Sequence, residues 1–331
     1  MSSVICIGSA GKDIFLPTRN GTVIETPKDI MAQRKVCFEL GGKIRITDRH
    51  EDSGGCAANI AIGLARLGVV SGLHTKIGDD EAGEWIMRRL RAEGVDSALV
   101  QKETGARTDL SVIIVDEQSS DRTIFVNRDV NECLVVHPRA LLDAEWIFLG
   151  ALHQPEWKDT FSKLGAWCAS RDVKIAFNPG QHQITQDSAA VRAMIGKSAI
   201  VFLNTDEAIE LMYEHGAAKD RNPRILLRAI HALGAARVVL TDGARGAWAT
   251  DGTVVFHVAA QDVSSKDMTG AGDAFSAAFF AALLRGENLQ TSLAWGSANG
   301  ASVVQFYGAT EGLLREKDII HHSHDIIARA V

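Results

Sequence analysis

Cysteine is scarce in this sequence, and the cysteines present are not spaced as metal ligands. The 331 residues contain five of them, Cys6, Cys37, Cys56, Cys133 and Cys168, without any Cys-x-x-Cys pair. An odd number of scattered cysteines argues against a disulfide framework or a structural zinc site and fits a reducing compartment. We therefore expect a cytoplasmic protein whose cysteines mostly serve as small buried apolar residues.

A long hydrophobic run and an excess of positive charge are also missing. The longest apolar stretch, residues 274–284, is too short to span a bilayer. The start of the chain, MSSVICIGSAG, has neither a basic beginning nor a cleavable apolar segment, so we expect no signal peptide. The formal net charge of −6 argues against a general nucleic-acid or membrane-surface partner. It leaves room for small anionic ligands, because local backbone dipoles bind them.

Internal repeats, low-complexity tracts and Pro- or Gly-rich linkers are absent from the sequence. Nothing therefore marks a hinge between independent domains, and we expect residues 1–331 to form a single domain. Short apolar runs alternate with longer helical patterns. Strands are expected at 3–8, 146–149, 174–178, 200–203 and 238–241, and helices at 56–67 and 81–93. This alternation predicts an α/β fold with a mostly parallel sheet between two layers of helices.

Two segments interrupt the alternation. Residues 13–49 contain no good helical pattern, and residues 108–130 hold two β-type runs, SVIIV and RTIFVN, around a polar turn. Strands joined without a helix pair antiparallel, so both segments are predicted to form a small β-sheet that projects from the body. The residues alone leave two roles open for this sheet, a lid over a site or a structural extension.

The most informative motif is DMTGAGDAFSAAFFAALL, which begins at Asp267. Gly270, Ala271 and Gly272 precede a long apolar helix, whose free backbone N–H groups would point at a bound anion. Asp273 falls in the first turn of that helix. A carboxylate there could take a proton from an attacking hydroxyl while the N–H groups hold a phosphoryl group. The alternative is an Asp that only complements the helix dipole.

A second motif, SGGCAANIAIGLARLG at residues 53–68, places Gly54 and Gly55 before a helix and Asn59 on its otherwise apolar surface. Paired glycines allow a ligand to approach the backbone closely, and an Asn near a helix start binds hydroxyl groups. The alternative is an Asn that caps the helix, which is common.

Together these motifs resemble those of the ribokinase-like (PfkB) carbohydrate kinases, and the similarity covers nearly the whole chain. GGCAANIAIGLARLG is similar to the N-terminal signature of the family, with Gly78 where its next glycine belongs, and DMTGAGDAF is similar to the C-terminal signature. Between them, NTDEA at 204–208 resembles the Asn-x-x-Glu motif for Mg²⁺ and phosphate. TDGARGAW at 241–248 resembles the nucleotide-binding strand and turn.

The resemblance implies a three-layer αβα sandwich with the small β-sheet, residues 13–49 and 108–130, as its lid. It implies that Asp273 is the catalytic base and that residues 270–272 form the anion hole. The remaining implied roles are Mg²⁺ and phosphate binding, partly through water, by Asn204 and Glu207, nucleotide contact by Thr241 and Gly243, and substrate binding by Asp13, Gly54, Gly55, Asn59 and His153. For His153, the alternative is a plain loop histidine. Thr205 is the expected N-cap of the helix that carries Glu207.

Four positions depart from the family pattern, and one of them is Met268, which stands where the family usually has a small or β-branched residue. Cys56 and Gly11 stand where ribokinase itself has a Lys and an Asn of the sugar site, which argues against ribose as the substrate. Asp267 and the carbonyl of Thr269 match part of a monovalent cation site. However, Gly312 stands where ribokinase has a serine oxygen, so we expect only weak activation by K⁺.

The resemblance implies an enzyme that transfers the γ-phosphoryl group of ATP to a primary hydroxyl of a sugar or sugar acid, with Mg²⁺. A nucleoside kinase on the same scaffold is one alternative. A non-catalytic sugar- or nucleotide-binding regulator is another, although a pure binder needs no base at Asp273. The expected partners are a small-molecule sugar, sugar acid or nucleoside, with neither nucleic acid nor membrane. A homodimer is also expected, because exposed lid strands often pair with a second copy.

Overall fold

A nine-stranded sheet forms the centre of the computed structural model, which describes residues 4–26, 34–118, 122–141, 144–212 and 221–331. Parts of the two expected lid segments, residues 27–33 and 119–121, lie outside the described residues. The strand order is β17-β16-β15-β14-β13-β12-β11-β1-β6. Six strands of this sheet are parallel to one another: β1 (Val4–Ile7), β6 (Ser71–His74), β11 (Trp146–Leu149), β12 (Lys174–Phe177), β13 (Ile200–Asn204) and β14 (Val238–Thr241).

The far edge of this sheet is antiparallel. It consists of β15 (Ala247–Thr250), β16 (Val255–Val258) and β17 (Arg329–Ala330). The predicted strands at 146–149 and 238–241 are confirmed residue for residue, and the others are confirmed to within one residue at each described end. The sheet is therefore mostly parallel, as the alternating pattern predicts.

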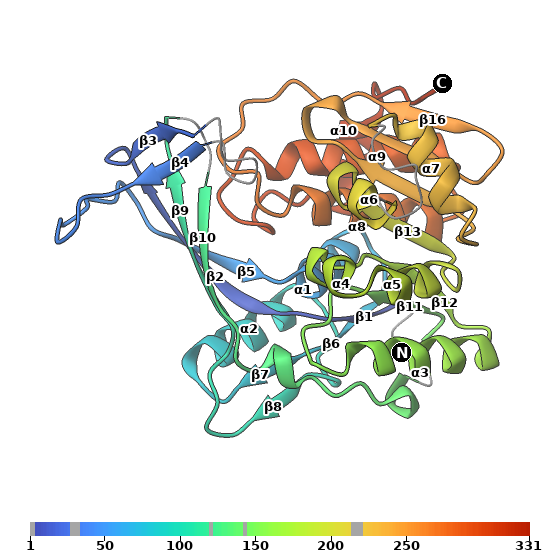
Figure 1. Ribbon diagram of the computed structural model, residues 1–331, viewed down its shortest axis with the longest axis horizontal. Coiled ribbons are helices and arrows are strands. Elements are labelled where there is room, and N and C mark those ends of the chain that lie inside the picture. Colours follow the sequence, from blue (N-terminus) through green and yellow to red (C-terminus); the bar gives the residue numbers. More distant parts are fainter. Residues whose placement is uncertain (1–3, 27–33, 119–121, 142–143, 213–220) are drawn as a thin grey trace.

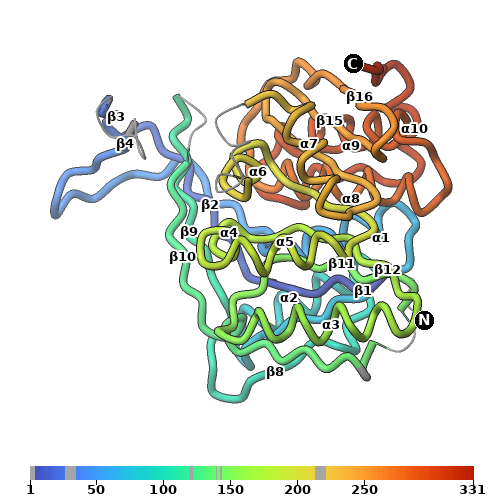
Figure 2. Tube along the Cα trace, turned by 45° about the vertical axis from the view of Figure 1, so that its right-hand side comes forward, coloured from blue at the N-terminus to red at the C-terminus, as the bar shows by residue number. Residues whose placement is uncertain are grey.

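Helices cover both faces of the sheet and make a three-layer sandwich (Figures 1 and 2). One layer packs on the face that includes Cys6 and Phe148, and the other packs on the face that includes Ile147 and Leu149. This alternation follows from the two-residue period of a strand. The first layer contains α1 (Cys56–Arg66), α2 (Glu81–Ala92), α8 (Ala271–Leu284), α9 (Leu289–Val303) and α10 (Glu316–Ser323). The second contains α3 (Trp157–Arg171), α4 (Gln181–Gln186), α5 (Ser188–Ile195), α6 (Thr205–Met212) and α7 (Pro223–His231).

A separate four-stranded sheet, called the small sheet below, projects from this body (Figure 1). Its order is β10 (Arg122–Asn127), β9 (Leu110–Asp116), β2 (Gly11–Thr18) and β5 (His50–Gly54). The antiparallel pairing of β9 with β10 is confirmed, whereas β2 pairs with β9 in parallel. The sheet begins at Gly11 and extends to Gly54, beyond the expected boundaries of 13–49, because polar β5 pairs along β2.

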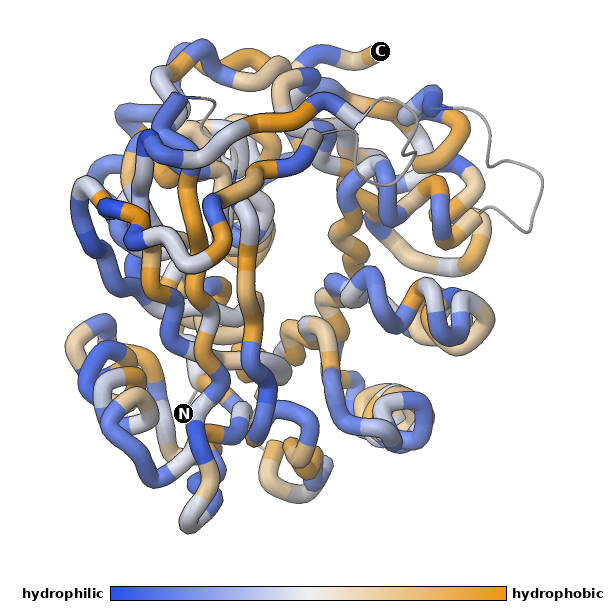
Figure 3. The backbone as a smooth tube through the Cα atoms, turned by 60° about the vertical axis from the view of Figure 1, so that its left-hand side comes forward, coloured by the Kyte–Doolittle hydropathy of each residue, from blue (hydrophilic) through white to orange (hydrophobic). Residues whose placement is uncertain are grey.

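Two shorter pairs of strands complete the described structure. β3 (Thr22–Glu25) pairs with β4 (Arg34–Cys37), and β7 (Lys76–Gly78) pairs with β8 (Gln101–Glu103). Figure 3, in which the small sheet comes forward, shows hydrophobic residues along its strands. Across the described ranges, every helix is too short or too polar to cross a membrane.

Candidate active site

Helix α8 begins at a tight backbone turn that only glycine tolerates. Its N-cap, Gly270, has a φ of 75°, and a Cβ there would lie 2.3 Å from the Cβ of Ala309. The first N–H groups of a helix have no partner within the helix. At the start of α8 the N–H of Ala271 donates to the Met268 carbonyl at 3.4 Å, whereas those of Gly272 and Asp273 have no partner among the described residues and can bind an anion. Asp273 lies in this first turn as predicted, but Ala271 and Gly272, expected to precede the helix, are already its first two residues, because the helix begins directly after Gly270.

Asp273 is held at the centre of the site by groups from α1. The Asn59 side-chain amide donates a hydrogen bond of 2.8 Å to Asp273 Oδ2. The Cys56 thiol lies between Asp273 and Asn178 Oδ1, which is 3.4 Å from the sulfur. Burial raises the pKa of Asp273, while hydrogen bonds from Asn59 and Cys56 oppose the rise. A carboxylate with a raised pKa is a better proton acceptor near neutral pH than an exposed one.

Close packing of two helices explains why Asn59 reaches Asp273. A Cβ on Gly63 would lie 2.7 Å from the Cβ of Ala277, so glycine at this position lets α1 and α8 approach. Asn59 precedes Gly63 by four residues, and Asp273 precedes Ala277 by four residues, which is about one helical turn in each case. The Asn59 and Asp273 side chains therefore meet one helical turn before the contact between Gly63 and Ala277, towards the N-termini of α1 and α8.

On one side of Asp273 lies Asp13 of the small sheet. A Cβ on Gly54 would lie 2.3 Å from Asp13 Oδ1, so the predicted glycine makes room for this carboxylate. The pKa of Asp13 is raised to about 6, mainly by burial and also by the nearby carboxylates of Asp52, Asp267 and Asp273, against a hydrogen bond with Ser111. Of the five predicted substrate residues, Asp13 and Asn59 thus lie beside Asp273, Gly54 lies against Asp13, and Gly55 is the N-cap of α1.

Asp267 holds the loop that precedes α8. It is fully buried, and its Oδ1 accepts hydrogen bonds from the backbone N–H and the hydroxyl of Thr269, at 3.0 and 2.7 Å. Its Oδ2 accepts from the N–H of Gly308 at 3.2 Å. No described cationic side chain forms an ion pair with it. Asp267 and Thr269 thus lie together, beside the start of α8.

On the other side of Asp273 is a cavity of about 190 Å³. The predicted phosphate residues Asn204 and Glu207 line it, and so do Thr241, Gly272 and Asp273. These residues come from β13, α6, β14 and α8, whose ends meet at one edge of the sheet. Asn178 and Ser276 also line this cavity.

Asn204, rather than the expected Thr205, caps helix α6. Its Oδ1 accepts a hydrogen bond of 2.8 Å from the N–H of Glu207, and Glu207 Oε2 accepts one of 2.9 Å from the N–H of Asn204. This reciprocal pair is a capping box. The pKa of Glu207 is raised to about 7, mainly by burial and in part by the Asp273 carboxylate, against the hydrogen bond from the Asn204 N–H. Such a carboxylate, without an ion pair among the described residues, suits a cation.

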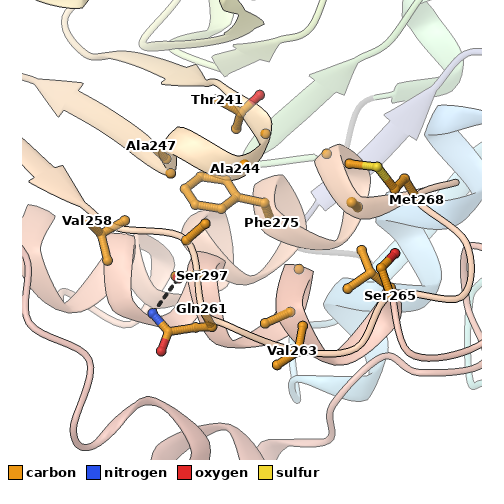
Figure 4. Close-up of a pocket in the computed structure, with 18 residues that line it drawn as sticks. Thr241, Ala244, Ala247, Val258, Gln261, Val263, Ser265, Met268, Phe275 and Ser297 are labelled. Atoms are coloured by element: carbon orange, nitrogen blue, oxygen red, sulfur yellow. Dashed lines mark hydrogen bonds between the residues drawn. The ribbon is translucent and has the colours of Figure 1, made fainter. Parts of the chain in front are cut away.

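A second, mainly apolar cavity of about 300 Å³ adjoins the first (Figure 4). Thr241 and Gly272 line both cavities, so the two lie side by side. Predicted Gly243 lines the second one, together with Ala244, Ala247, Met268 and Phe275, which lie inside the motifs but have no predicted nucleotide role, and with Val258, Val263 and Val304 from outside them. The residues that line this apolar pocket come from several elements, so the pocket can be recognised only in the folded chain.

His153, predicted to face the substrate, lies after β11 and stacks on His182 at a centroid distance of 4.7 Å. Asn178 and His182, which the motifs do not identify, follow the next strand, β12. Asn178 is a polar residue directly after a buried strand, and this position is the sequence signal that could identify it. Its side chain contacts Cys56 and the backbone of β13. Among the described residues, no group of three or more His, Cys, Asp or Glu side chains is arranged to hold a metal by itself.

Comparison with known proteins agrees with this geometry. The model of the pfkB family carbohydrate kinases matches residues 28–316, so the chain belongs to that family of enzymes. It is 26% identical over 318 residues to a 5-dehydro-2-deoxygluconokinase of Bacillus velezensis, covering 88% of this chain and 93% of the relative.

Two solved structures share the fold. An E. coli protein provisionally called ribokinase II, solved with ATP and Mg²⁺, has a TM-score of 0.79 at 22% identity, covering 98% of this chain and 99% of the other. A nucleoside kinase of Burkholderia thailandensis, solved with inosine, has a TM-score of 0.78 at 18% identity, covering 97% of each chain. The predicted fold class and family are therefore confirmed.

Proposed function

We propose that this protein transfers the γ-phosphoryl group of ATP to a primary hydroxyl of a sugar or sugar acid, with Asp273 as the general base. One observation carries the proposal. Asp273 lies between a pair of adjacent cavities on one side and the Asn59 and Asp13 side chains on the other. The apolar cavity suits the adenine base, the smaller cavity suits the phosphates, and the polar side suits sugar hydroxyls.

The reaction requires in-line attack of the acceptor oxygen on the γ-phosphorus. The new O–P bond forms as the bond to the β-phosphate oxygen breaks, and the hydroxyl proton passes to the Asp273 carboxylate. The N–H groups of residues 270–272 bind the charge on the transferred group. Asn59 and Cys56 hold the Asp273 carboxylate in place for this transfer.

Two cations have candidate ligands in this arrangement. Glu207 and Asn204 would hold Mg²⁺ through water beside the phosphates, since Mg²⁺ keeps several waters and takes one or two carboxylates. Asp267 and the Thr269 carbonyl would contribute to a K⁺ site next to the anion hole. A bound Mg²⁺ would neutralise charge on the phosphates.

The small sheet has the position required of a lid, since Asp13 on β2 and Gly54 on β5 lie beside Asp273. We propose that body and lid act as a single kinase domain. The outermost strand of the sheet, β10, exposes Ile124, Phe125 and Val126, which supports dimerisation through this edge.

A coupled ADP-release assay over sugars, sugar acids and nucleosides tests the proposal. We expect ADP release above the acceptor-free rate with at least one sugar or sugar acid. Turnover with nucleosides alone would select the nucleoside kinase instead. Binding of ATP and a sugar without any acceptor-dependent ADP release would indicate the non-catalytic regulator.

A further inference from the structure

Three side chains that are cationic or can become so gather beside the site, outside the phosphate and base roles described above. His153 follows β11, His182 lies at the start of α4, and Arg128 directly follows β10 of the small sheet. The two imidazole rings stack with centroids 4.7 Å apart and planes 23° apart. Arg128 interacts electrostatically with both rings. Body and small sheet thus contribute to one cluster, called the cationic cluster below.

The two histidines have different hydrogen-bonding states. His182 Nε2 lies 2.9 Å from the Leu152 carbonyl oxygen, which fixes the ring and makes this nitrogen the donor. Neither ring nitrogen of half-buried His153 has a described hydrogen-bond partner. The stacking on a fixed ring therefore orients His153 while leaving both of its nitrogens available to a ligand.

The backbone that carries Arg128 is firmly anchored. Asp109 Oδ1 accepts hydrogen bonds from the N–H groups of Asp129 and Val130, at 2.9 and 3.1 Å. Asn131 then donates from its side chain to the Ala10 carbonyl at 2.8 Å, at the start of the small sheet. Arg128 itself is exposed, and no described carboxylate forms an ion pair with it. Its positive charge, which acts on both histidines, is therefore not neutralised by an ion pair within the described residues.

Negative charge is lacking around the histidines. The pKa of His153 is lowered to about 3 by burial first and then by Arg128 and His182, so this imidazole is neutral near pH 7 and the positive charge of the cluster lies on Arg128. The pKa of His182 is also lowered by burial and by Arg128, against a hydrogen bond to the Leu152 carbonyl. No carboxylate contributes to either shift. A negatively charged ligand would provide the counter-charge that Arg128 and the two histidines lack.

The cationic cluster is close to the reacting end of the site. His153 is three residues beyond Gly150, where a Cβ would lie 3.7 Å from Cys56 Sγ, and Cys56 contacts Asp273. His182 is four residues beyond Asn178, which contacts the same sulfur. Carboxyl ends of neighbouring parallel strands, here β11 and β12, meet at one edge of the sheet. A small acceptor with its hydroxyl at Asp273 would extend towards the cluster.

From this arrangement we propose that Arg128, His153 and His182 bind an acidic group of the acceptor, a carboxylate or a phosphate ester, at the end remote from the hydroxyl that reacts. The proposal rests on the proposed kinase function and narrows its substrate class to acidic sugars. A guanidinium binds either group through two parallel hydrogen bonds, and the His153 imidazole adds a third donor.

Matched pairs of acceptors test this subsite. Gluconate is compared with glucitol for the carboxylate, and fructose 6-phosphate with fructose for the phosphate ester. The wild-type protein should use the charged member of at least one pair with a kcat/KM at least about tenfold higher. Arg128→Gln should reduce that preference about ten- to hundredfold, the size of one lost hydrogen bond to an ionised group, and leave the KM for ATP unchanged. His153→Gln should reduce it less, because Gln keeps a donor.

Arg122→Gln provides the matched control. Arg122 is exposed and stands at the opposite end of β10, about 16 Å from the Asn127 end that Arg128 follows, so the same charge is removed at a distance from the histidines. This variant should keep the wild-type preference. Equal use of charged and neutral acceptors by the wild type, or an equal loss in both arginine variants, would overturn the proposal.

Calorimetric binding of gluconate and fructose 6-phosphate without ATP separates this proposal from the kinase function. Binding of either anion that weakens at least about tenfold in Arg128→Gln but not in Arg122→Gln supports the subsite, even if no acceptor is phosphorylated. Turnover of neutral sugars together with anion binding that ignores Arg128 would overturn the subsite and leave the kinase function standing.

Discussion

The Asn59 side-chain amide donates a hydrogen bond of 2.8 Å to Asp273 Oδ2, although the two residues are 214 positions apart in the chain. Two signature motifs therefore meet at one carboxylate. Glycine at position 63 permits this meeting, because any larger residue would push α1 away from α8 at Ala277. The packing of α1 on α8 therefore positions Asp273, the proposed base, as much as its place in the first turn of α8 does.

Glu207→Gln should weaken the response to Mg²⁺ and lower kcat, with little effect on sugar affinity. The amide keeps the capping box with Asn204, since Gln also accepts a hydrogen bond, but it loses the charge that faces the phosphate cavity. Initial rates over a Mg²⁺ titration measure the effect. Asp206→Asn, in the same first helical turn but exposed to solvent, is the control. An unchanged Mg²⁺ response with reduced stability would mean that Glu207 serves only the helix dipole.

The same variant should change how stability depends on pH. The folded-state pKa of Glu207 is raised to about 7 from 4.5, so between these values the folded protein binds more protons than the unfolded one. Stability of the wild type must then fall as pH rises through this window. Glu207→Gln should be more stable than the wild type at pH 8 by about 1–2 kcal/mol, and this advantage should vanish near pH 4.5. Urea unfolding at both pH values would reveal the opposite sign if the carboxylate were stabilising.

Potassium should activate the enzyme only weakly, at most several-fold. Gly312 cannot be replaced by a residue with an oxygen ligand, because a Cβ there would lie 2.6 Å from the Phe306 ring and 2.7 Å from the Ser302 carbonyl. Backbone carbonyls and water are left to complete the shell around the Asp267 loop, which larger cations tolerate. Initial rates in K⁺ and in tetramethylammonium at equal ionic strength measure the activation. Complete dependence on K⁺ would show that the site is intact despite Gly312.

Asp52→Asn should lower both stability and turnover. Asp52, at the base of the small sheet, accepts hydrogen bonds from the N–H and the hydroxyl of buried Thr310, at 2.6 and 2.5 Å. The neighbouring Ala309 packs on Gly270 of the anion hole. An amide leaves one of these donors unpaired, which costs about 1–3 kcal/mol.

A displaced loop at residues 308–310 should reduce kcat about tenfold while ATP binding is retained, because small misplacements at a reacting centre are costly. The control is Asp48→Asn, because Asp48 is exposed and lies four residues before Asp52. Loss of stability with an unchanged kcat would show that Asp52 supports the fold alone.

Phe125→Glu should convert a dimer to monomers without unfolding the chain. Phe125 is 61% exposed on edge strand β10, between Ile124 and Val126, which are 47% and 51% exposed. An edge strand with exposed apolar residues pairs readily with a second copy. Light scattering after size exclusion gives the mass of each species. Ile225→Glu on α7, also exposed and apolar, should remain a dimer. A monomeric wild type would contradict this assembly.

The parallel sheet, its helices and the start of α8 could be predicted because their signals are local. Apolar runs of the length of a strand, and glycines before an apolar helix, need no knowledge of distant residues. Strand β5 could not be predicted in this way, because HEDSG has no β-type residues and becomes a strand only by pairing with β2. Its inclusion depends on tertiary contact rather than on propensity.

The candidate site could be predicted only in part for the same reason. Asp273 and Asn59 belong to motifs, but nothing in the sequence places one against the other or brings Arg128 to His182. Asn and Thr are both good helix caps, so the sequence does not distinguish the predicted cap of α6, Thr205, from its neighbour. In the structure the cap is Asn204, the last residue of β13, which is hydrogen-bonded to Glu207.

Turnover of Asp273→Asn is the most direct measurement of the central claim. Asn keeps the shape and the position beside Asn59 but cannot accept the hydroxyl proton. With the best acceptor, kcat in the ADP-release assay should therefore fall at least about 10²–10⁴-fold while calorimetry shows ATP affinity within a few-fold of the wild type. Asp318→Asn, in the first turn of α10, removes an equivalent helix-terminal charge and should leave kcat unchanged. A near-normal kcat in Asp273→Asn would contradict the assignment of this residue as the base.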